Sequence, residues 1–163
     1  MTNTIARELK QEKSFASPEQ EILLGLLVAS ARVLEPWERF LKTAAQLTNN
    51  QYNVLRILRG SHPAMLACND ISERMIDRDP DITRLIDRLE KRGLVKRFRS
   101  SRDRRVVEVG ITKKGLAIVR GLDPHARRMP KALLGHLGVE KLQQLGHLLE
   151  AVISGMGRFP DQK

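Results

Sequence analysis

The sequence predicts a mainly helical fold with one small β-hairpin, and three observations support this class. Apolar residues recur at helical spacing in most segments, and these segments open on capping residues and close on glycine. Only one pair of short runs, Leu94 to Phe98 and Val106 to Ile111, has the pattern of antiparallel strands. Aromatic residues make up 4% of the 163 residues, which favours aliphatic helix packing over a β-sandwich.

The N-terminal part predicts an arm followed by a long helix. Residues 1–16 are polar and aperiodic, as expected of a flexible arm. A helix then begins where Ser17 can cap and Pro18 suits the first helical position. Pro36 lacks a backbone donor and predicts a kink or restart. The apolar stripe is broader than one small domain covers, so residues 17–47 are predicted to be an N-terminal dimerisation helix region. Its members are Ile22, Leu26, Ala29 and Val33, with Leu23, Leu27 and Leu34 beside them.

Three short helices and the hairpin follow. Thr48 and Gln51 form a predicted capping box for a helix that ends at Gly60. A second box, Asp70 with Glu73, opens a short helix, and Asp79-Pro80 starts the next helix, which stops at Gly93. Short helices followed by a two-stranded hairpin make a winged helix-turn-helix, predicted over residues 48–115.

The C-terminal part predicts further helices. Thr112 can cap a helix that Pro124 and Pro130 are expected to break or kink, and Gly138 separates a last helix. Residues 116–157 are thus predicted to be C-terminal dimerisation helices, and residues 158–163 a tail. Apolar stripes left over at both ends of the chain suit a symmetric dimer.

Positive charge concentrates between Arg84 and Arg105. Ten Lys or Arg side chains there oppose three acids, so the segment carries +7 of the chain's net +10. The pI near 10.4 favours an anionic partner, either nucleic acid or a membrane surface. A capped amphipathic helix before a cationic two-stranded ribbon suits double-stranded DNA, because one element can enter a groove while the other meets the flanking backbone.

Other classes of function lack support in the sequence. No apolar run approaches the roughly 18 residues of a membrane span, and the N-terminus lacks the apolar middle of a signal peptide. No motif for catalysis or for phosphate binding occurs, so we expect neither an enzyme nor a cofactor. Cys68, the single cysteine, fits a reducing cytoplasm, and a small apolar filler is a better interpretation of it than a redox thiol. We expect no metal site among the histidines, which are His62, His125, His136 and His147.

Several segments together resemble the MarR family of bacterial transcription regulators. They are LTNNQYNVLRIL (Leu47 to Leu58), PDITRLIDRLEKRGLVKR (Pro80 to Arg97) and DRRVVEVGITKKG (Asp103 to Gly115). A D-x-R wing followed by an apolar-Thr-x-x-Gly closure is a fairly specific pairing, and the similarity covers nearly the whole chain. The tail from Leu137 to Val152 also resembles the family's final dimerisation helix, whereas the loop from Ser61 to Asn69 departs from the family pattern.

The resemblance implies a homodimer whose terminal helices interlock and whose two wings flank a DNA duplex. Family members bind pseudo-palindromic operators and often repress their own promoters. They commonly release DNA when a small anionic or phenolic ligand, or an oxidant, arrives. The resemblance also implies that a wing aspartate orients the arginine two positions later, which here are Asp103 and Arg105.

Nine residues are predicted to contact DNA: Pro80, Asp81, Thr83, Arg84, Arg88, Arg102, Asp103, Arg104 and Arg105. Arg84 can make a bidentate contact with guanine through two guanidinium nitrogens, and the wing arginines suit a narrow minor groove. Asp81 either accepts from cytosine or favours the positive end of the helix, and Arg88 contacts a phosphate or an internal carboxylate. The competing interpretations are an ordinary surface helix and a solvated basic turn.

Trp37, Phe40 and Tyr52 are candidates for the lining of an effector pocket, although aromatic residues at such spacings are more often plain core. The sequence therefore predicts a cytoplasmic, homodimeric, sequence-specific regulator that binds double-stranded DNA, acting as a ligand-responsive repressor. Two alternatives remain open. One is a winged-helix module that docks onto an acidic protein, and the other is a sequence-neutral architectural DNA-binding protein.

Overall fold

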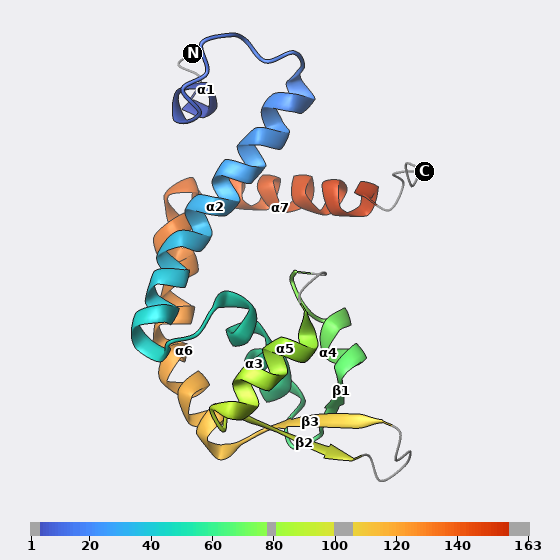
Figure 1. The fold of residues 1–163 in the computed structure, drawn as a ribbon. Coiled ribbons are helices and arrows are strands. Elements are labelled where there is room, and N and C mark those ends of the chain that lie inside the picture. Colours follow the sequence, from blue (N-terminus) through green and yellow to red (C-terminus); the bar gives the residue numbers. More distant parts are fainter. Residues whose placement is uncertain (1–3, 78–80, 100–105, 157–163) are drawn as a thin grey trace. The chain divides into compact units, whose positions relative to one another are not determined.

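The computed structural model describes residues 4–77, 81–99 and 106–156, and Figure 1 shows their order in the chain. The helices and strands are α1 (Thr4–Glu8), α2 (Pro18–Ala45), α3 (Asn49–Ser61), β1 (Leu66–Ala67), α4 (Cys68–Glu73), α5 (Ile82–Lys91), β2 (Val95–Arg99), β3 (Val107–Ile111), α6 (Lys113–Leu134), the 3-10 turn η1 (Gly135–Leu137) and α7 (Gly138–Gly155). Two compact units, residues 1–122 and 123–163, divide the chain within α6. The predicted mainly helical class with a small sheet is confirmed.

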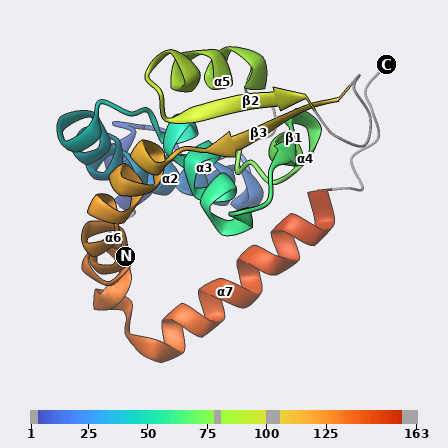
Figure 2. The ribbon, with the colours of Figure 1, turned by 90° about the horizontal axis from the view of Figure 1, so that it is seen from below.

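The first unit is built around a three-stranded antiparallel sheet in the order β1-β3-β2. β3 lies in the middle, with Val109 opposite both Leu66 of β1 and Arg97 of β2. Figure 2 shows α5 running beside β2 and α3 beside β3, and both pairs are in contact. The side chains that fill the space between these elements are fully buried: Leu41, Leu55, Ile71, Ile86, Leu89 and Val109. This core fixes α5 against the sheet.

The segment expected to be a loose arm contains the short helix α1, which packs on α2. The Glu8 carboxylate accepts a hydrogen bond of 2.8 Å from Arg32, and Ile5 lies over Gly25. A Cβ atom at position 25 would lie only 2.7 Å from Ile5 Cδ1, so the glycine makes room for the isoleucine. An apolar contact and an ion pair thus hold this short helix on α2, although its sequence shows no periodicity.

Most predicted helix starts are found, with two corrections. Thr48 and Gln51 form the expected reciprocal capping box at α3. Asp70, however, is the third residue of α4 rather than its cap, and its carboxylate accepts from the Ala67 N–H at 3.3 Å. The cap of α5 is Asp81 and not Asp79, so this helix begins two residues later than the sequence pattern indicated. Neighbouring acids compete for the same cap, and the pattern does not discriminate between them.

The breaks or restarts that the sequence allowed at the prolines do not occur, and the alternative of a kink stays a prediction. α2 runs without interruption through Pro36, and α6 runs through Pro124 and Pro130. Each proline removes one backbone hydrogen bond, and the remaining bonds of a long helix hold the turn on either side. The strands also begin one residue later than predicted, and β1 was missed because two residues carry no strand pattern. No helix in the described part of the chain is long and apolar enough to cross a membrane.

The start of α6 packs unusually closely on the start of β2. The Thr112 hydroxyl donates to the Gly93 carbonyl at 2.8 Å and accepts from the Gly115 N–H at 3.1 Å. Gly115 is buried, and a Cβ atom there would overlap the Leu94 carbonyl oxygen and lie 2.8 Å from Ile111 Cγ1. The Thr-x-x-Gly spacing thus joins the end of β3, the first turn of α6 and the backbone that leaves α5.

Replacing Gly115 by alanine should therefore destabilise the first unit. The new methyl group meets backbone that moves only if α6 or β2 shifts, so we expect a loss of about 1–3 kcal/mol in the free energy of unfolding. Urea titration followed by circular dichroism measures it. The matched control is Gly60→Ala in α3, where no atom lies within 4 Å of the position that the new methyl group would take, and a gain of about 0.4–1 kcal/mol is expected. Equal changes in both variants would contradict the close-approach argument.

Candidate nucleic-acid interface

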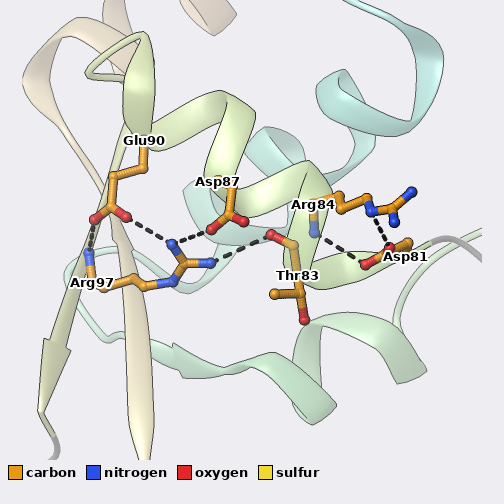
Figure 3. Close-up of polar contacts among 6 residues, drawn as sticks. All are labelled: Asp81, Thr83, Arg84, Asp87, Glu90 and Arg97. Carbon is orange, nitrogen blue, oxygen red and sulfur yellow. Dashed lines mark hydrogen bonds and ion pairs between the residues drawn. The ribbon is translucent and has the colours of Figure 1, made fainter.

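The N-terminal turn of α5 is closed by a local cap and ion pair. Asp81 Oδ1 accepts a hydrogen bond of 3.1 Å from the Arg84 backbone N–H, and Asp81 Oδ2 lies 3.0 Å from Arg84 Nε (Figure 3). The Arg84 side chain is 78% exposed. Its Nε is held while its two terminal nitrogens have no partner within the described ranges. This arrangement leaves a preoriented pair of donors at the positive end of a helix.

The turn that leads into α5 is anchored by polar residues of α3. The Asn53 side-chain oxygen accepts a hydrogen bond of 3.0 Å from the Ile76 N–H, and Asn50 Nδ2 donates to Asp77 at 3.1 Å. Asn53 is buried, so its amide would be costly to leave unpaired. These two bonds hold Ile76 and Asp77, which follow α4, against α3.

The outer face of α5 carries the other predicted residues that the structure describes. Thr83 and Arg88 are exposed, and Arg88 has no ion-pair partner among the described residues. The alternative of an internal ion pair for Arg88 therefore gains no support. Five predicted residues lie outside the described ranges: Pro80, Arg102, Asp103, Arg104 and Arg105.

Two arginines of the cationic segment are engaged inside the unit, which the sequence did not indicate. Arg97 of β2 bonds Asp87 and Glu90 of α5 (Figure 3), and Arg92 donates to the Gln46 and Ala45 carbonyls at 2.7 Å each. The net +7 counted along the chain therefore includes cations that are committed to structure. Their spacing from the groups they bind is too irregular for a sequence pattern to reveal, since a turn at Gly93 reverses the chain between Glu90 and Arg97.

Arg92 stands where three helices meet. Its guanidinium binds the C-terminal carbonyls of α2, its own residue follows the end of α5, and its carbonyl accepts from Lys114 of α6 at 2.9 Å. Positive donors at the C-terminal ends of helices satisfy carbonyls that lack an intrahelical partner. Arg92 therefore fixes the end of α5 to the end of α2.

A hollow of about 630 Å³ lies beside Arg92, and we refer to it as the α2–α6 hollow. Its lining includes Phe40, Thr43, Gln46, Arg92, Ile118 and Leu122. Side chains from the last turns of α2 and the first turns of α6 make one wall apolar, while the Arg92 guanidinium supplies the strongest polar group. A volume of this size suits a small organic molecule.

The three aromatic candidates form one cluster, and only one of them lines this hollow. The Trp37 ring stacks on Phe40 with centroids 5.6 Å apart and meets Tyr52 edge to face at 5.0 Å. Trp37 and Tyr52 are buried in the core, and Phe40 is half-buried. The cluster is therefore packed between α2 and α3, with Phe40 as its only member in the lining of the α2–α6 hollow.

No group of three or more metal-ligating side chains gathers within the described ranges. Cys68 is half-buried at the first position of α4. The site is thus a surface of charges and hydrogen-bond donors.

Comparison with known proteins identifies the chain. A model of the MarR family matches residues 47–107. The homoprotocatechuate degradative operon repressor of Escherichia coli is 32% identical over 108 residues, which cover 66% of this chain and 72% of the relative. The chain belongs to the MarR family. Proteins of this family are DNA-binding transcription regulators and not enzymes, so the sequence-based prediction of both properties is confirmed.

Solved structures agree with this assignment. A MarR transcription factor from Planctomyces limnophilus is 40% identical and superimposes with a TM-score of 0.62, covering 85% of this chain and 99% of its own. Bordetella bronchiseptica BpsR, solved in a study of how 6-hydroxynicotinic acid regulates its DNA binding, is 25% identical with a TM-score of 0.69 and covers 81% of this chain and 98% of its own. The winged helix-turn-helix of the family is therefore the fold of the first unit's α3-to-β3 region.

Proposed function

We propose that this MarR-family protein is a homodimeric, sequence-specific repressor that binds a pseudo-palindromic operator and responds to a small ligand. The observation that carries the proposal is the N-terminal turn of α5, where an exposed Arg84 is preoriented by its own cap. The strand that follows is pinned to the same helix through Arg97. A rigid helix end and an adjacent basic strand can engage one duplex together.

In this proposal, α5 enters the major groove with its first turn nearest to the bases. Arg84 offers two terminal nitrogens to guanine O6 and N7, and Thr83 bonds a base or a phosphate. The Asp81 carboxylate is already occupied by the cap and by Arg84, so its contribution is orientation of that arginine rather than a contact with cytosine. Pro80 lies beside this turn in the sequence, and Arg88 contacts a phosphate one turn onward.

The wing residues complete the footprint in the proposal. Arg102, Arg104 and Arg105 approach the minor groove, where the negative potential favours guanidinium groups, and Asp103 orients Arg105. The family resemblance supports these four assignments. Their place in the chain, between two strands that pair regularly from Val95 with Ile111 to Arg99 with Val107, supports them further.

Two exposed apolar surfaces support the homodimer. On α2, Ile22, Leu23 and Leu27 are 57–60% exposed, and they continue the stripe that farther along the helix is buried as Trp37 and Leu41. On α7, a second group on one helix face is exposed: Leu148, Leu149, Val152 and Ile153. A monomer rarely leaves so much apolar surface open on two long helices, whereas a symmetric interface covers each surface twice.

The α2–α6 hollow supports the ligand response. We propose that it binds a small aromatic carboxylic acid, with Phe40 and Ile118 against the ring and Arg92 on the carboxylate. Such a ligand competes for the guanidinium that holds the ends of α2 and α5 together. One relative is named for homoprotocatechuate, and 6-hydroxynicotinic acid regulates DNA binding by BpsR; both compounds are aromatic acids. A regulator of transcription acts where the chromosome lies, so the cytoplasmic location stays a prediction that rests on this function.

Two other functions can be distinguished from the proposed one by experiment. A module that docks onto an acidic protein would not protect a DNA fragment by itself. An architectural binder would hold random DNA as tightly as any selected sequence. Selection of bound sequences from random DNA with the purified protein separates both from an operator-binding regulator.

Arg84 and Arg105 should affect DNA binding in different ways. On the selected sequence, Arg84→Ala should cost about 1–3 kcal/mol, roughly 5- to 150-fold, and should leave binding to random DNA nearly unchanged because a base contact is lost. Arg105→Ala should weaken binding to all sequences. Fluorescence anisotropy with labelled duplexes measures both.

Wild-type affinity should also fall about 10³–10⁵-fold between about 50 and 200 mM salt if 6–10 phosphates are neutralised. Equal losses from both variants on both DNAs would contradict the placement of α5, and a flat salt response would contradict the DNA footprint.

Charged substitutions on either open apolar surface should break the dimer. Leu27→Glu on α2 and Ile153→Glu on α7 place a carboxylate where an apolar contact is expected, so sedimentation should show monomers and operator affinity should fall with them. Ile76→Glu is the control for sedimentation alone, because Ile76 is 76% exposed and belongs to neither helix but lies in the turn that leads into α5. A monomeric wild type, or a dimer that survives both substitutions, would remove the symmetric-operator argument.

Ligand binding in the hollow should be visible through Trp37, the only tryptophan of the chain. Because Phe40 stacks on Trp37 and lines the hollow, homoprotocatechuate or 6-hydroxynicotinic acid bound there should change the Trp37 emission and weaken DNA binding. Arg92→Gln should abolish both responses. Thr43→Ser, which trims one methyl group from the same lining, should retain them. Weakened DNA binding without any change in Trp37 emission would place the ligand elsewhere.

A further inference from the structure

Arg97 differs from the other described cations of its segment in how it is held. Its guanidinium spans α5 at three points: Nη1 lies 2.6 Å from Asp87 Oδ1 and 2.8 Å from Glu90 Oε2, and Nη2 donates to the Thr83 carbonyl at 3.4 Å (Figure 3). The side chain is 26% exposed, against 78% for Arg84. A planar guanidinium reaches several acceptors at once, and here they come from successive turns of one helix.

The backbone of Arg97 joins the same network. β2 is an edge strand, and its outward N–H groups have no neighbouring strand to bond. The Arg97 N–H donates to Glu90 Oε1 at 2.8 Å, so one carboxylate holds both the main chain and the side chain of this residue. Glu90 thereby closes the open edge of the sheet at the point where α5 passes it.

In this contact one guanidinium meets two carboxylates, so the three side chains together carry a net charge of −1. Asp87 and Glu90 are the acids of α5, and both lie within 3 Å of the Arg97 guanidinium on the strand. Partial burial works against the charged guanidinium, but the hydrogen bonds to Asp87 and Glu90 outweigh it and raise the pKa of Arg97 above its ordinary value. A cation already bound to two carboxylates has little left to offer a phosphate.

We propose that Arg97 is a positioning residue that fixes the angle between α5 and the β2 strand and thereby sets sequence discrimination, without contacting DNA. This inference rests on the proposed function. Base readout requires the first turn of α5 to enter a groove while the strand beside it stays on the backbone. A change in their mutual angle withdraws the base contacts and leaves the phosphate contacts able to adjust.

The test compares Arg97→Gln with Arg99→Gln on selected and random duplexes over a salt series. Arg99 lies two residues along the same strand, is exposed and has no described partner. Arg97→Gln should lower the ratio of specific to non-specific affinity by about tenfold, the effect of one mismatched base pair, and keep the slope of log affinity against log salt. Arg99→Gln should keep the ratio, and its slope should fall by about 0.9 if it meets a phosphate. An unchanged ratio in Arg97→Gln, or a slope that falls by about one while the ratio holds, would overturn the proposal.

A triple variant distinguishes a role of Arg97 in offsetting the charge of Asp87 and Glu90 from a role in positioning α5. Arg97→Gln combined with Asp87→Asn and Glu90→Gln leaves no uncompensated carboxylate, so general DNA affinity should recover. Discrimination should stay low, because the helix is still unfastened. Full recovery of the ratio would show that Arg97 only neutralises the two acids, which contradicts a positioning role.

Arg97→Lys is the control for misfolding of the Arg97 variants. It keeps the charge but reaches fewer acceptors, so it should discriminate to a degree between wild type and Arg97→Gln, with a near-native unfolding midpoint. Wild-type discrimination in this variant would overturn the proposal. The two hypotheses fail differently: if the wild type itself prefers no sequence, the proposed function fails, whereas a discriminating wild type with a discriminating Arg97→Gln defeats only the present inference.

Discussion

A helix and a strand that both carry excess positive charge lie against each other in this protein, and their contact depends on the Arg97 network. Without an intervening group, the cations of α5 and β2 would repel at short range. Asp87 and Glu90 place two carboxylates between them, and Arg97 takes up both while its N–H satisfies the open sheet edge. The same contact therefore compensates charge, closes an edge strand and sets an angle, so the outward-facing cations are displayed from a fixed frame.

The frame continues at the other end of α5, where packing replaces charge balance. Gly115 brings α6 against the Leu94 carbonyl, the Thr112 hydroxyl bonds the Gly93 carbonyl, and Arg92 reaches the carbonyls that end α2. Each of these contacts involves backbone atoms, so α5 has little freedom to move independently of α2 and α6. Arg92 directly follows α5, so a ligand that displaced its guanidinium would disturb the end of that helix, and the proposed ligand response requires such a connection.

Local rules explain which parts of the structure the sequence could predict. Capping depends on residues three apart, so the Thr48 box could be predicted. Apolar periodicity predicts that Ile82, Leu85, Ile86 and Leu89 pack inward; all of these except Leu85 are buried, and Leu85 is half-buried. The choice of Asp81 over Asp79 depends on which acid meets the first helical N–H groups, and helix continuity through Pro124 depends on the turns on either side; neither follows from the neighbouring residue types. β1 exists only because β3 pairs with it, which is a non-local condition.

The candidate site shows the same division at the level of charge. Sequence reasoning counted cations and placed Arg84 correctly on an exposed first turn, because exposure at a helix start follows from the pattern of the helix. It gave Arg97 and Arg92 the same weight, although one faces two carboxylates and the other faces two carbonyls. Their partners lie across a chain reversal or nearly fifty residues away, so only the folded chain distinguishes an exposed cation such as Arg84 from one that binds groups within the unit.

In the proposed homodimer, the long helix α2 contributes both to association and to the support of α3. Its 28 residues extend about 42 Å, and one continuous apolar stripe serves two purposes along that length. Toward the C-terminus the stripe is buried as Trp37 and Leu41 in the core that supports α3, while toward the N-terminus it stays open at Leu23 and Leu27. Because both halves belong to one uninterrupted helix, a partner that covers the open half fixes the direction of the buried half. In the proposed dimer, the spacing between the two copies of α5 is then set by one continuous helix whose C-terminal carbonyls bind Arg92, rather than by a loop.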